Sequence, residues 1–122
     1  MTVDVAAVVV SGDLVNKPSV ANYEAYNQAA ESLHSLGAPV FLCLGNHDDR
    51  ALFRQCVLGV DGGRPTDPYY YSDQIRGLRI IVLDTRGNTA GTIGVDAEQL
   101  DWLEQEVKKP ADHGSLVVMH HP

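Results

Sequence analysis

The sequence has little or nothing of several features that mark common protein classes. Its 122 residues contain no run of about 18 apolar side chains, which excludes a membrane-spanning helix. Lysine and arginine form no cluster, and 9 basic residues stand against 16 acidic ones, for a net charge of -7 at pH 7. An acidic chain without a basic patch does not suit a nucleic-acid backbone. We therefore expect neither a membrane nor a nucleic-acid polymer as its partner.

Cysteine is also scarce. The two cysteines, Cys43 and Cys56, do not share a metal-binding spacing such as Cys-x-x-Cys. Both lie in apolar stretches, which favours reduced thiols packed as small apolar side chains. The first residues, Met1–Val5, lack the basic stretch and apolar run with which a secretory signal begins. These features predict a cytoplasmic protein.

The residues that are present predict a folded α/β domain. With 44% hydrophobic and 20% charged residues, the composition is that of a soluble globular protein. Short apolar runs, which we interpret as buried strands, occupy Val5–Val10, Pro39–Leu44, Leu78–Leu83 and Leu116–Met119. Helical spacing or helix-end signals occupy Val20–Leu36, Asp49–Val57 and Asp96–Lys109. This alternation predicts mainly parallel strands, with one hairpin between Tyr69–Ser72 and Leu78–Leu83.

Polar residues follow the expected strands at the point where each one ends. They are Gly12-Asp13, Gly45-Asn46-His47-Asp48, Asp84-Thr85 and His120-His121. Parallel strands bring their carboxyl ends to one edge of a sheet, where α/β proteins bind ligands. Carboxylate, carboxamide and imidazole groups suit Zn, Mn or Fe, and a glycine before such a residue lets the backbone turn sharply. The sequence therefore predicts a metal site at this edge.

Several of these polar residues have a purely structural interpretation. We expect Asp84 to hydrogen-bond nearby backbone rather than a ligand, because a carboxylate after a strand commonly caps a turn. His34 lies in a predicted helix and His113 in a predicted loop, and both are expected to be ordinary histidines without a ligand.

The run Gly45–Asp48 differs, because a turn does not require an imidazole between a carboxamide and a carboxylate. Asn46 can ligate a metal through its neutral carbonyl oxygen. His47 can face a substrate as a general acid or an electrostatic clamp, and Asp48 is expected to fix the tautomer of His47.

The order of these motifs resembles the calcineurin-like metallophosphoesterase superfamily. The resemblance rests on Gly12-Asp13, Gly45-Asn46-His47-Asp48 and Met119-His120-His121-Pro122. The segments Leu83-Asp84-Thr85 and Asp96–Leu103 resemble its bacterial class III cyclic-nucleotide phosphodiesterase branch. The resemblance implies a four-layer α/β/β/α sandwich that holds two divalent metals. It also implies a small phosphoester substrate such as a cyclic nucleotide, attacked by a metal-bridging hydroxide.

The resemblance further implies a role for individual residues. Asp13 would bridge the two metals, and Asn46 and His120 would ligate the second one. This ligand set suits Mn, Fe and Zn alike, and the bound cations would attract a phosphate that the acidic chain otherwise repels.

The remaining implied roles concern the substrate. His47 would stabilise charge or protonate the leaving oxygen, while Asp48 orients it. Arg50 would contact an anionic substrate, and His121 would neighbour the ligand His120.

The sequence departs from the family pattern at both ends. The family begins with an Asp-x-His motif, but Asp4-Val5-Ala6 lacks the histidine, and the later Gly-His-x-His motif does not occur. We therefore expect residues 1–122 to be one truncated domain, inactive alone and holding at most one partial metal site. One alternative is a non-catalytic binding module on a degenerate phosphoesterase fold. Another is a receiver domain that accepts phosphate on Asp84, which the residues after the first and last strands disfavour.

Overall fold

The structure is a computed structural model that describes residues 4–89 and 91–122. Strands and helices alternate along the chain as expected. They are β1 (Val8–Val10), α1 (Val20–His34), β2 (Val40–Leu42), α2 (Arg50–Phe53), the π-helical segment η1 (Arg54–Leu58), β3 (Tyr71–Ile75), β4 (Leu78–Val82), α3 (Ala97–Lys108) and β5 (Ser115–Val118). The predicted α/β class is confirmed.

The strands form two sheets whose pairing is mainly parallel. In the first sheet β1 lies parallel to β2, with Val9 opposite Phe41. In the second, β4 pairs antiparallel with β3 and parallel with β5. The turn between β3 and β4 consists of Arg76 and Gly77, with φ of 49° and 83°. Two left-handed residues are typical of a tight hairpin turn, so the predicted hairpin is confirmed.

The two faces of β2 belong to two different cores. Phe41 and Cys43 pack with Ile80, Val82 and Val118 of the second sheet. Leu42 and Leu44 face the other way and pack against a cluster that contains Tyr23 and Phe53 from the helices. This alternation is the side-chain period of a strand that is buried on both faces.

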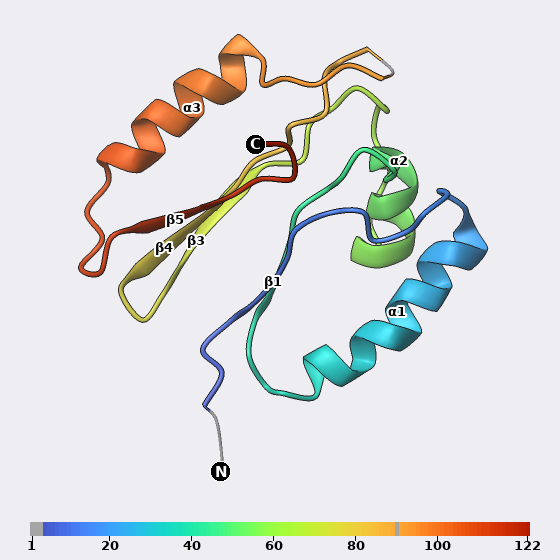
Figure 1. Cartoon of the computed structure of the whole chain (residues 1–122), viewed down its shortest axis with the longest axis horizontal. Coiled ribbons are helices and arrows are strands. Elements are labelled where there is room, and N and C mark those ends of the chain that lie inside the picture. The colour runs from blue at the N-terminus through green and yellow to red at the C-terminus, as the bar shows by residue number, and fades with distance from the viewer. Residues whose placement is uncertain (1–3, 90) are drawn as a thin grey trace.

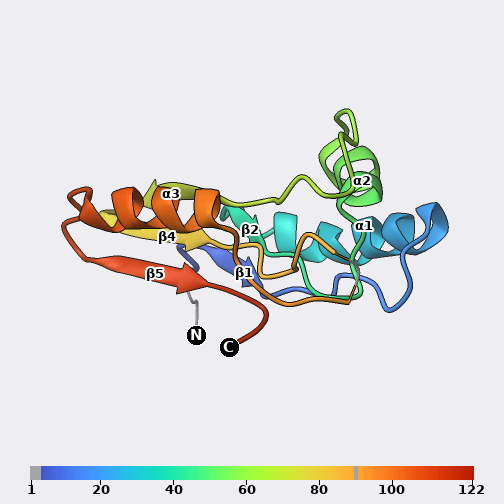
Figure 2. The ribbon, with the colours of Figure 1, turned by 90° about the horizontal axis from the view of Figure 1, so that it is seen from above.

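The order of layers follows from these two cores. In Figure 1, α3 lies beyond the sheet β3–β4–β5, and α1 and α2 lie beyond β1 on the opposite side. Figure 2 shows α3 covering the strands β4 and β5. The arrangement is helix, sheet, sheet, helix, in agreement with the expected α/β/β/α layers. Among the described residues, no helix is both long enough and apolar enough to cross a membrane.

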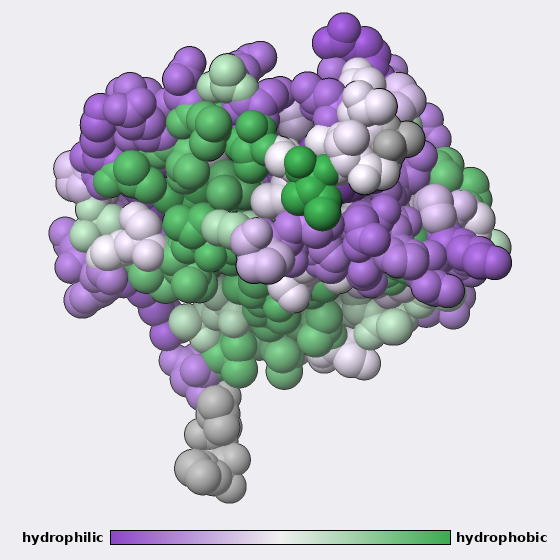
Figure 3. All heavy atoms as spheres, turned by 45° about the horizontal axis from the view of Figure 1, so that its top comes forward, coloured by the Kyte–Doolittle hydropathy of each residue, from purple (hydrophilic) through white to green (hydrophobic). Residues whose placement is uncertain are grey.

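Helix α3 begins as predicted but presents an unexpected face. The Asp96 carboxylate accepts a hydrogen bond from the backbone N–H of Gln99 at 2.8 Å and so caps the helix. Leu100 and Val107, which belong to the apolar stripe read from the sequence, are each 51% exposed, whereas Gln99 and Glu106 are buried. Apolar side chains accordingly gather on the surface over α3 and β5 (Figure 3).

Candidate metal centre and the adjoining pocket

Three predicted ligands, which follow β1, β2 and β5, meet at one edge of the molecule. The Nε2 atom of His120 lies 3.0 Å from Oδ1 of Asn46 and 3.5 Å from Oδ2 of Asp13. These residues are far apart in the sequence, so the strand ends bring them together. We call these three side chains the acceptor cluster.

Two glycines make this close approach possible. A Cβ atom on Gly12 would lie 2.5 Å from Nδ1 of His120, and one on Gly45 would lie 2.2 Å from Oδ1 of Asp13. Gly12 has a φ of 107°, and Asp13 itself has a φ of 54°. The left-handed conformation costs a non-glycine residue roughly 1–2 kcal/mol. The chain therefore accepts backbone strain where it positions the Asp13 carboxylate.

The hydrogen bonds of His120 determine which of its nitrogens faces the cluster. Nδ1 lies 2.9 Å from the carbonyl oxygen of Ser11, which can only accept, so Nδ1 carries a proton and donates. In the neutral imidazole Nε2 is then an acceptor, and it faces two oxygen acceptors, of Asn46 and Asp13. A metal cation between the three groups, or a second proton on Nε2, would relieve the contact between these acceptors. Metal-bound histidines commonly donate their other N–H to a carbonyl, as His120 does to Ser11.

The acceptor cluster offers three potential ligand groups to a divalent cation. Its carboxylate, carboxamide and imidazole groups are ligands that suit Mn, Fe or Zn. Within the described ranges, no group of three or more His, Cys, Asp and Glu side chains gathers to hold a metal. The acceptor cluster contains two such residues together with Asn46.

His47 lies next to the cluster, but Asn16 rather than Asp48 orients it. The backbone N–H of His47 donates to Oδ1 of Asp13 at 2.9 Å. Its Nδ1 lies 2.7 Å from the carbonyl oxygen of Asn16, which therefore holds the proton on that nitrogen. The imidazole is exposed, and Nε2 is left available to a substrate.

The Asp48 carboxylate turns into the protein instead. It is 1% exposed and accepts hydrogen bonds from the backbone N–H groups of Gly45 and Leu14 and from the Tyr23 hydroxyl, at 2.8, 3.2 and 3.1 Å. Burial raises the pKa of Asp48, while the two N–H donors act in the opposite direction. The expected contact with His47 is thus wrong, because the turn that begins at Gly45 directs Asp48 inward.

Arg50 is also committed to the protein. It is 3% exposed and donates from Nε and Nη2 to both carboxylate oxygens of Asp84, at 2.8 and 3.1 Å. Further bonds from its guanidinium reach the carbonyl oxygens of Pro65 and Arg86. Arg50 therefore has a structural role. Because it also lines the pocket described below, the expected contact with an anionic substrate stays a prediction.

Asp84 has the structural role that the sequence predicts. Besides Arg50, its carboxylate accepts hydrogen bonds from the backbone N–H groups of Tyr69 and Arg86, at 2.8 and 3.1 Å. The side chain of Gln99 bonds both the N–H and the carbonyl of Asp84, which explains why this polar residue of α3 is buried. We call Asp84, Arg50 and Gln99 the buried network.

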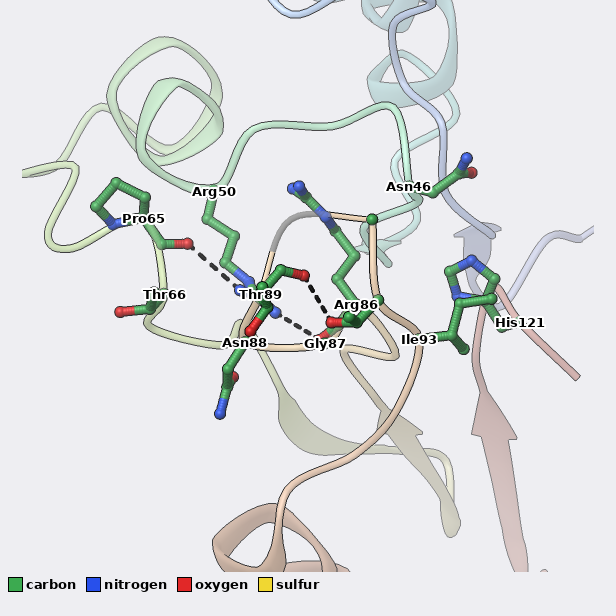
Figure 4. Close-up of a pocket in the computed structure, with 12 residues that line it drawn as sticks. Asn46, Arg50, Pro65, Thr66, Arg86, Gly87, Asn88, Thr89, Ile93 and His121 are labelled. Carbon is green, nitrogen blue, oxygen red and sulfur yellow. Dashed lines mark hydrogen bonds between the residues drawn. The ribbon is translucent and has the colours of Figure 1, made fainter.

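A cavity of about 410 Å³ adjoins the acceptor cluster (Figure 4). Asn46 and His121 line one side of it, and Nδ1 of His121 lies 2.8 Å from the Thr85 hydroxyl oxygen. Arg86 lines it too, and its guanidinium donates to the carbonyl oxygen of Asp48. Arg86 is not among the site residues expected from the sequence, although a basic residue directly after Asp84-Thr85 at a strand end is a usable signal.

Several known proteins are similar to this chain over nearly its whole length. A cAMP/cGMP dual specificity phosphodiesterase of Mycobacterium tuberculosis is 40% identical over 95% of this chain and 36% of its own length. A probable cyclic nucleotide phosphodiesterase of Rhodococcus erythropolis is 37% identical over 95% of this chain and 38% of its own. A glycerophosphodiester phosphodiesterase of Enterobacter lignolyticus is 33% identical over 95% of this chain and 41% of its own length.

The chain thus spans well under half the length of the curated relatives it matches. Residues 2–122 also match the family described as calcineurin-like phosphoesterase, which is nearly the whole chain. This match confirms the resemblance read from Gly12-Asp13, Gly45–Asp48 and Met119–Pro122. The chain belongs to the calcineurin-like phosphoesterase family.

Proposed function

We propose that this chain contributes part of the active site of a metal-dependent phosphodiesterase that acts on cyclic nucleotides or similar small phosphodiesters. The observation that carries the proposal is the acceptor cluster, three acceptors without a donor between them, beside a pocket of about 410 Å³. Two of the relatives are named as cyclic nucleotide phosphodiesterases, which supports this substrate class.

The residues of the cluster act by holding and aligning a cation. A cation held by Asp13, Asn46 and His120 would supply Lewis-acid stabilisation of the phosphoryl oxygens. The Ser11 carbonyl keeps the proton of His120 on Nδ1, so that Nε2 points its lone pair at the cation position.

His47 is the residue that we propose holds a proton toward the leaving oxygen. Its Nδ1–H is fixed by Asn16, so Nε2 is the nitrogen that exchanges a proton with the substrate. Asp48 acts as a positioning residue, because its carboxylate accepts hydrogen bonds from the N–H groups of Leu14 and Gly45. These residues directly follow Asp13 and directly precede Asn46 in the sequence, so their positions influence both cluster ligands.

We infer that further ligands come from outside these 122 residues. The acceptor cluster would hold one cation, and a two-metal mechanism would need further ligands for a second one. The relatives are more than twice as long as the matched region, which leaves room for the Asp-x-His and Gly-His-x-His motifs of the family. Both cysteines are free, which suits a reducing compartment such as the cytoplasm.

The test is His47→Ala in the full-length protein, assayed with cyclic AMP and with bis(p-nitrophenyl) phosphate. Losing a general acid lowers turnover by about 10²–10⁴-fold. Bound Mn²⁺, measured by elemental analysis, should not change, because His47 is not a member of the acceptor cluster. The matched control is His34→Ala on the exposed surface of α1, which leaves both quantities unchanged.

Two outcomes would contradict the proposal. Unchanged turnover in His47→Ala would remove the catalytic role of that residue. A full-length protein that binds Mn²⁺ but hydrolyses neither substrate would instead favour a non-catalytic binding module.

A further inference from the structure

Two arginines line the pocket, and their surroundings differ. The Arg50 guanidinium forms its ion pair with Asp84 in the buried network. Arg86 forms no ion pair among the described residues, and the hydrogen bond of its guanidinium goes to the neutral carbonyl oxygen of Asp48. Arg86 therefore brings a whole positive charge to the pocket, whereas the charge of Arg50 is neutralised.

The backbone holds Arg86 firmly in this place. Its N–H donates to Oδ1 of Asp84 at 3.1 Å, and its carbonyl oxygen accepts from Nη2 of Arg50 at 2.8 Å. Arg86 also forms a β-bridge with Ile93, and the N–H of Gly94 donates to the carbonyl of Thr85 at 2.9 Å. Since the buried network fixes the backbone and the Asp48 carbonyl already holds the guanidinium, less freedom is lost when the side chain binds a ligand.

The guanidinium extends toward the turn that carries the candidate cation ligand. Its acceptor, the carbonyl of Asp48, is two residues beyond Asn46, and Figure 4 shows the side chain reaching toward that turn. Asn46 and His121 lie along the same pocket. An anion in this pocket would meet the acceptor cluster, with its cation, on one side and Arg86 on the other.

We infer that Arg86 binds a phosphoryl oxygen of the substrate and sets the affinity of the pocket for phosphate. A guanidinium offers five donors, of which the carbonyl of Asp48 uses one, and planar pairs of N–H groups match two phosphate oxygens. The positive charge also opposes the net charge of -7, which by itself repels an anion. This inference rests on the proposed function for its substrate class.

The neighbouring wall suits the uncharged part of such a substrate. Asn88, Thr89 and Thr92 offer amide and hydroxyl groups, and Ile93, which is 66% exposed, offers an apolar surface. In Figure 4, Ile93 and His121 lie on the Asn46 side of the pocket. A sugar or base attached to the phosphate would meet these groups.

The experiment is Arg86→Gln in the full-length Mn²⁺-loaded protein, with inorganic phosphate as the probe in calorimetry and cyclic AMP in steady-state kinetics. Loss of a charge-assisted contact weakens phosphate binding by about tenfold or more. KM rises by a similar factor, while kcat changes by less than about threefold, since the contact is made before and during the reaction. Arg86→Lys restores part of the phosphate affinity because it keeps the charge.

Controls separate this role from a structural one and from the proposed function. Arg64→Gln removes an exposed arginine outside the pocket and should change neither constant. Bound Mn²⁺ and the melting temperature of Arg86→Gln should match the unaltered protein. Unchanged phosphate affinity, or a fall in kcat alone, would overturn the inference. If the protein hydrolyses no phosphodiester but its phosphate binding still depends on Arg86, the proposed function fails and the inference stands.

Discussion

The acceptor cluster and the buried network lie at the same edge of the molecule, yet their hydrogen bonding is opposite. In the buried network, every acceptor of Asp84 faces a donor from Arg50, Tyr69, Arg86 or Gln99. In the acceptor cluster, Nε2 of His120 faces two oxygens that cannot donate. Satisfied polar groups stabilise a fold, whereas facing acceptors are unfavourable until a metal cation or a proton comes between them.

The same contrast separates the two arginines of the pocket. Arg50 is 3% exposed and is paired with the Asp84 carboxylate, so removing either residue would leave the charge of the other buried without a partner. Arg86 is partly exposed and bonds a neutral carbonyl, so its charge is available to a ligand. Both arginines lie in the pocket wall, so their different roles follow from the group that each guanidinium contacts rather than from their location.

Asp84→Ala should produce the largest effect on stability. The substitution leaves the Arg50 guanidinium buried without its partner, which costs about 3–5 kcal/mol of unfolding free energy. Urea unfolding followed by the fluorescence of Trp102 measures the change. The control is Glu104→Gln, which breaks an exposed pair with Lys108 and should cost no more than about 1 kcal/mol. A loss in Asp84→Ala as small as in the control would refute the structural role.

Gly12→Ala tests the acceptor cluster in the same way. Its new Cβ would lie 2.5 Å from Nδ1 of His120, so the imidazole must move and Mn²⁺ affinity should fall by about 10–100-fold, as when a metal ligand loses its support. Gly37→Ala is the matched control, because Gly37 also has a positive φ, 74°, but open space around it. Calorimetric Mn²⁺ titration that gives equal affinities for both variants would argue against the cluster.

Asp13→Asn tests whether the acceptor cluster, unlike the buried network, contributes little to the stability of the metal-free protein. Removing one carboxylate from three facing acceptors relieves repulsion, so we expect the unfolding free energy to change by less than about 1 kcal/mol while Mn²⁺ binding is lost. Urea unfolding with and without Mn²⁺ makes the comparison. A large loss of stability in the metal-free protein would mean that the cluster, like the buried network, mainly serves the fold.

The effect with the least bearing on the site concerns Cys43, in the core beside the buried network, and it shows only at alkaline pH. Burial raises the pKa of its thiol from 9.0 to about 11, so between these values the unfolded chain releases a proton that the folded chain keeps. The unfolding free energy should therefore fall as the pH rises from 9 to 11, by about 2 kcal/mol. Cys43→Ala should make the decline between pH 9 and 10 less steep, although the tyrosines, whose pKa values burial also raises, contribute to the rest of it. An equally steep decline in that variant would assign it to other groups.

Local signals in the sequence were sufficient for most of the fold and for the candidate ligands. The apolar runs predicted the strands because a strand buried on both faces shows no polar residues, as Phe41 to Leu44 illustrate. Parallel strands share one carboxyl edge, which is why Asp13, Asn46 and His120 could be expected to meet.

What the sequence could not predict depends on contacts between distant segments. Asp48 follows His47 directly, yet its partners Leu14 and Tyr23 lie 34 and 25 residues earlier in the sequence. Gln99 is buried only because Asp84 offers it a backbone N–H and a carbonyl. The π-helical segment η1 after α2 has no local signature that distinguishes it from a continued helix, so Asp49–Val57 was predicted as one helix.

The most direct test of the account is anomalous X-ray diffraction at the manganese edge, from crystals of the full-length protein grown with Mn²⁺. If the acceptor cluster binds a cation, a peak is expected within bonding distance of Nε2 of His120 and of the side-chain oxygens of Asp13 and Asn46. A structure with no peak there, in which a doubly protonated His120 donates from Nε2 to Oδ1 of Asn46, would contradict it.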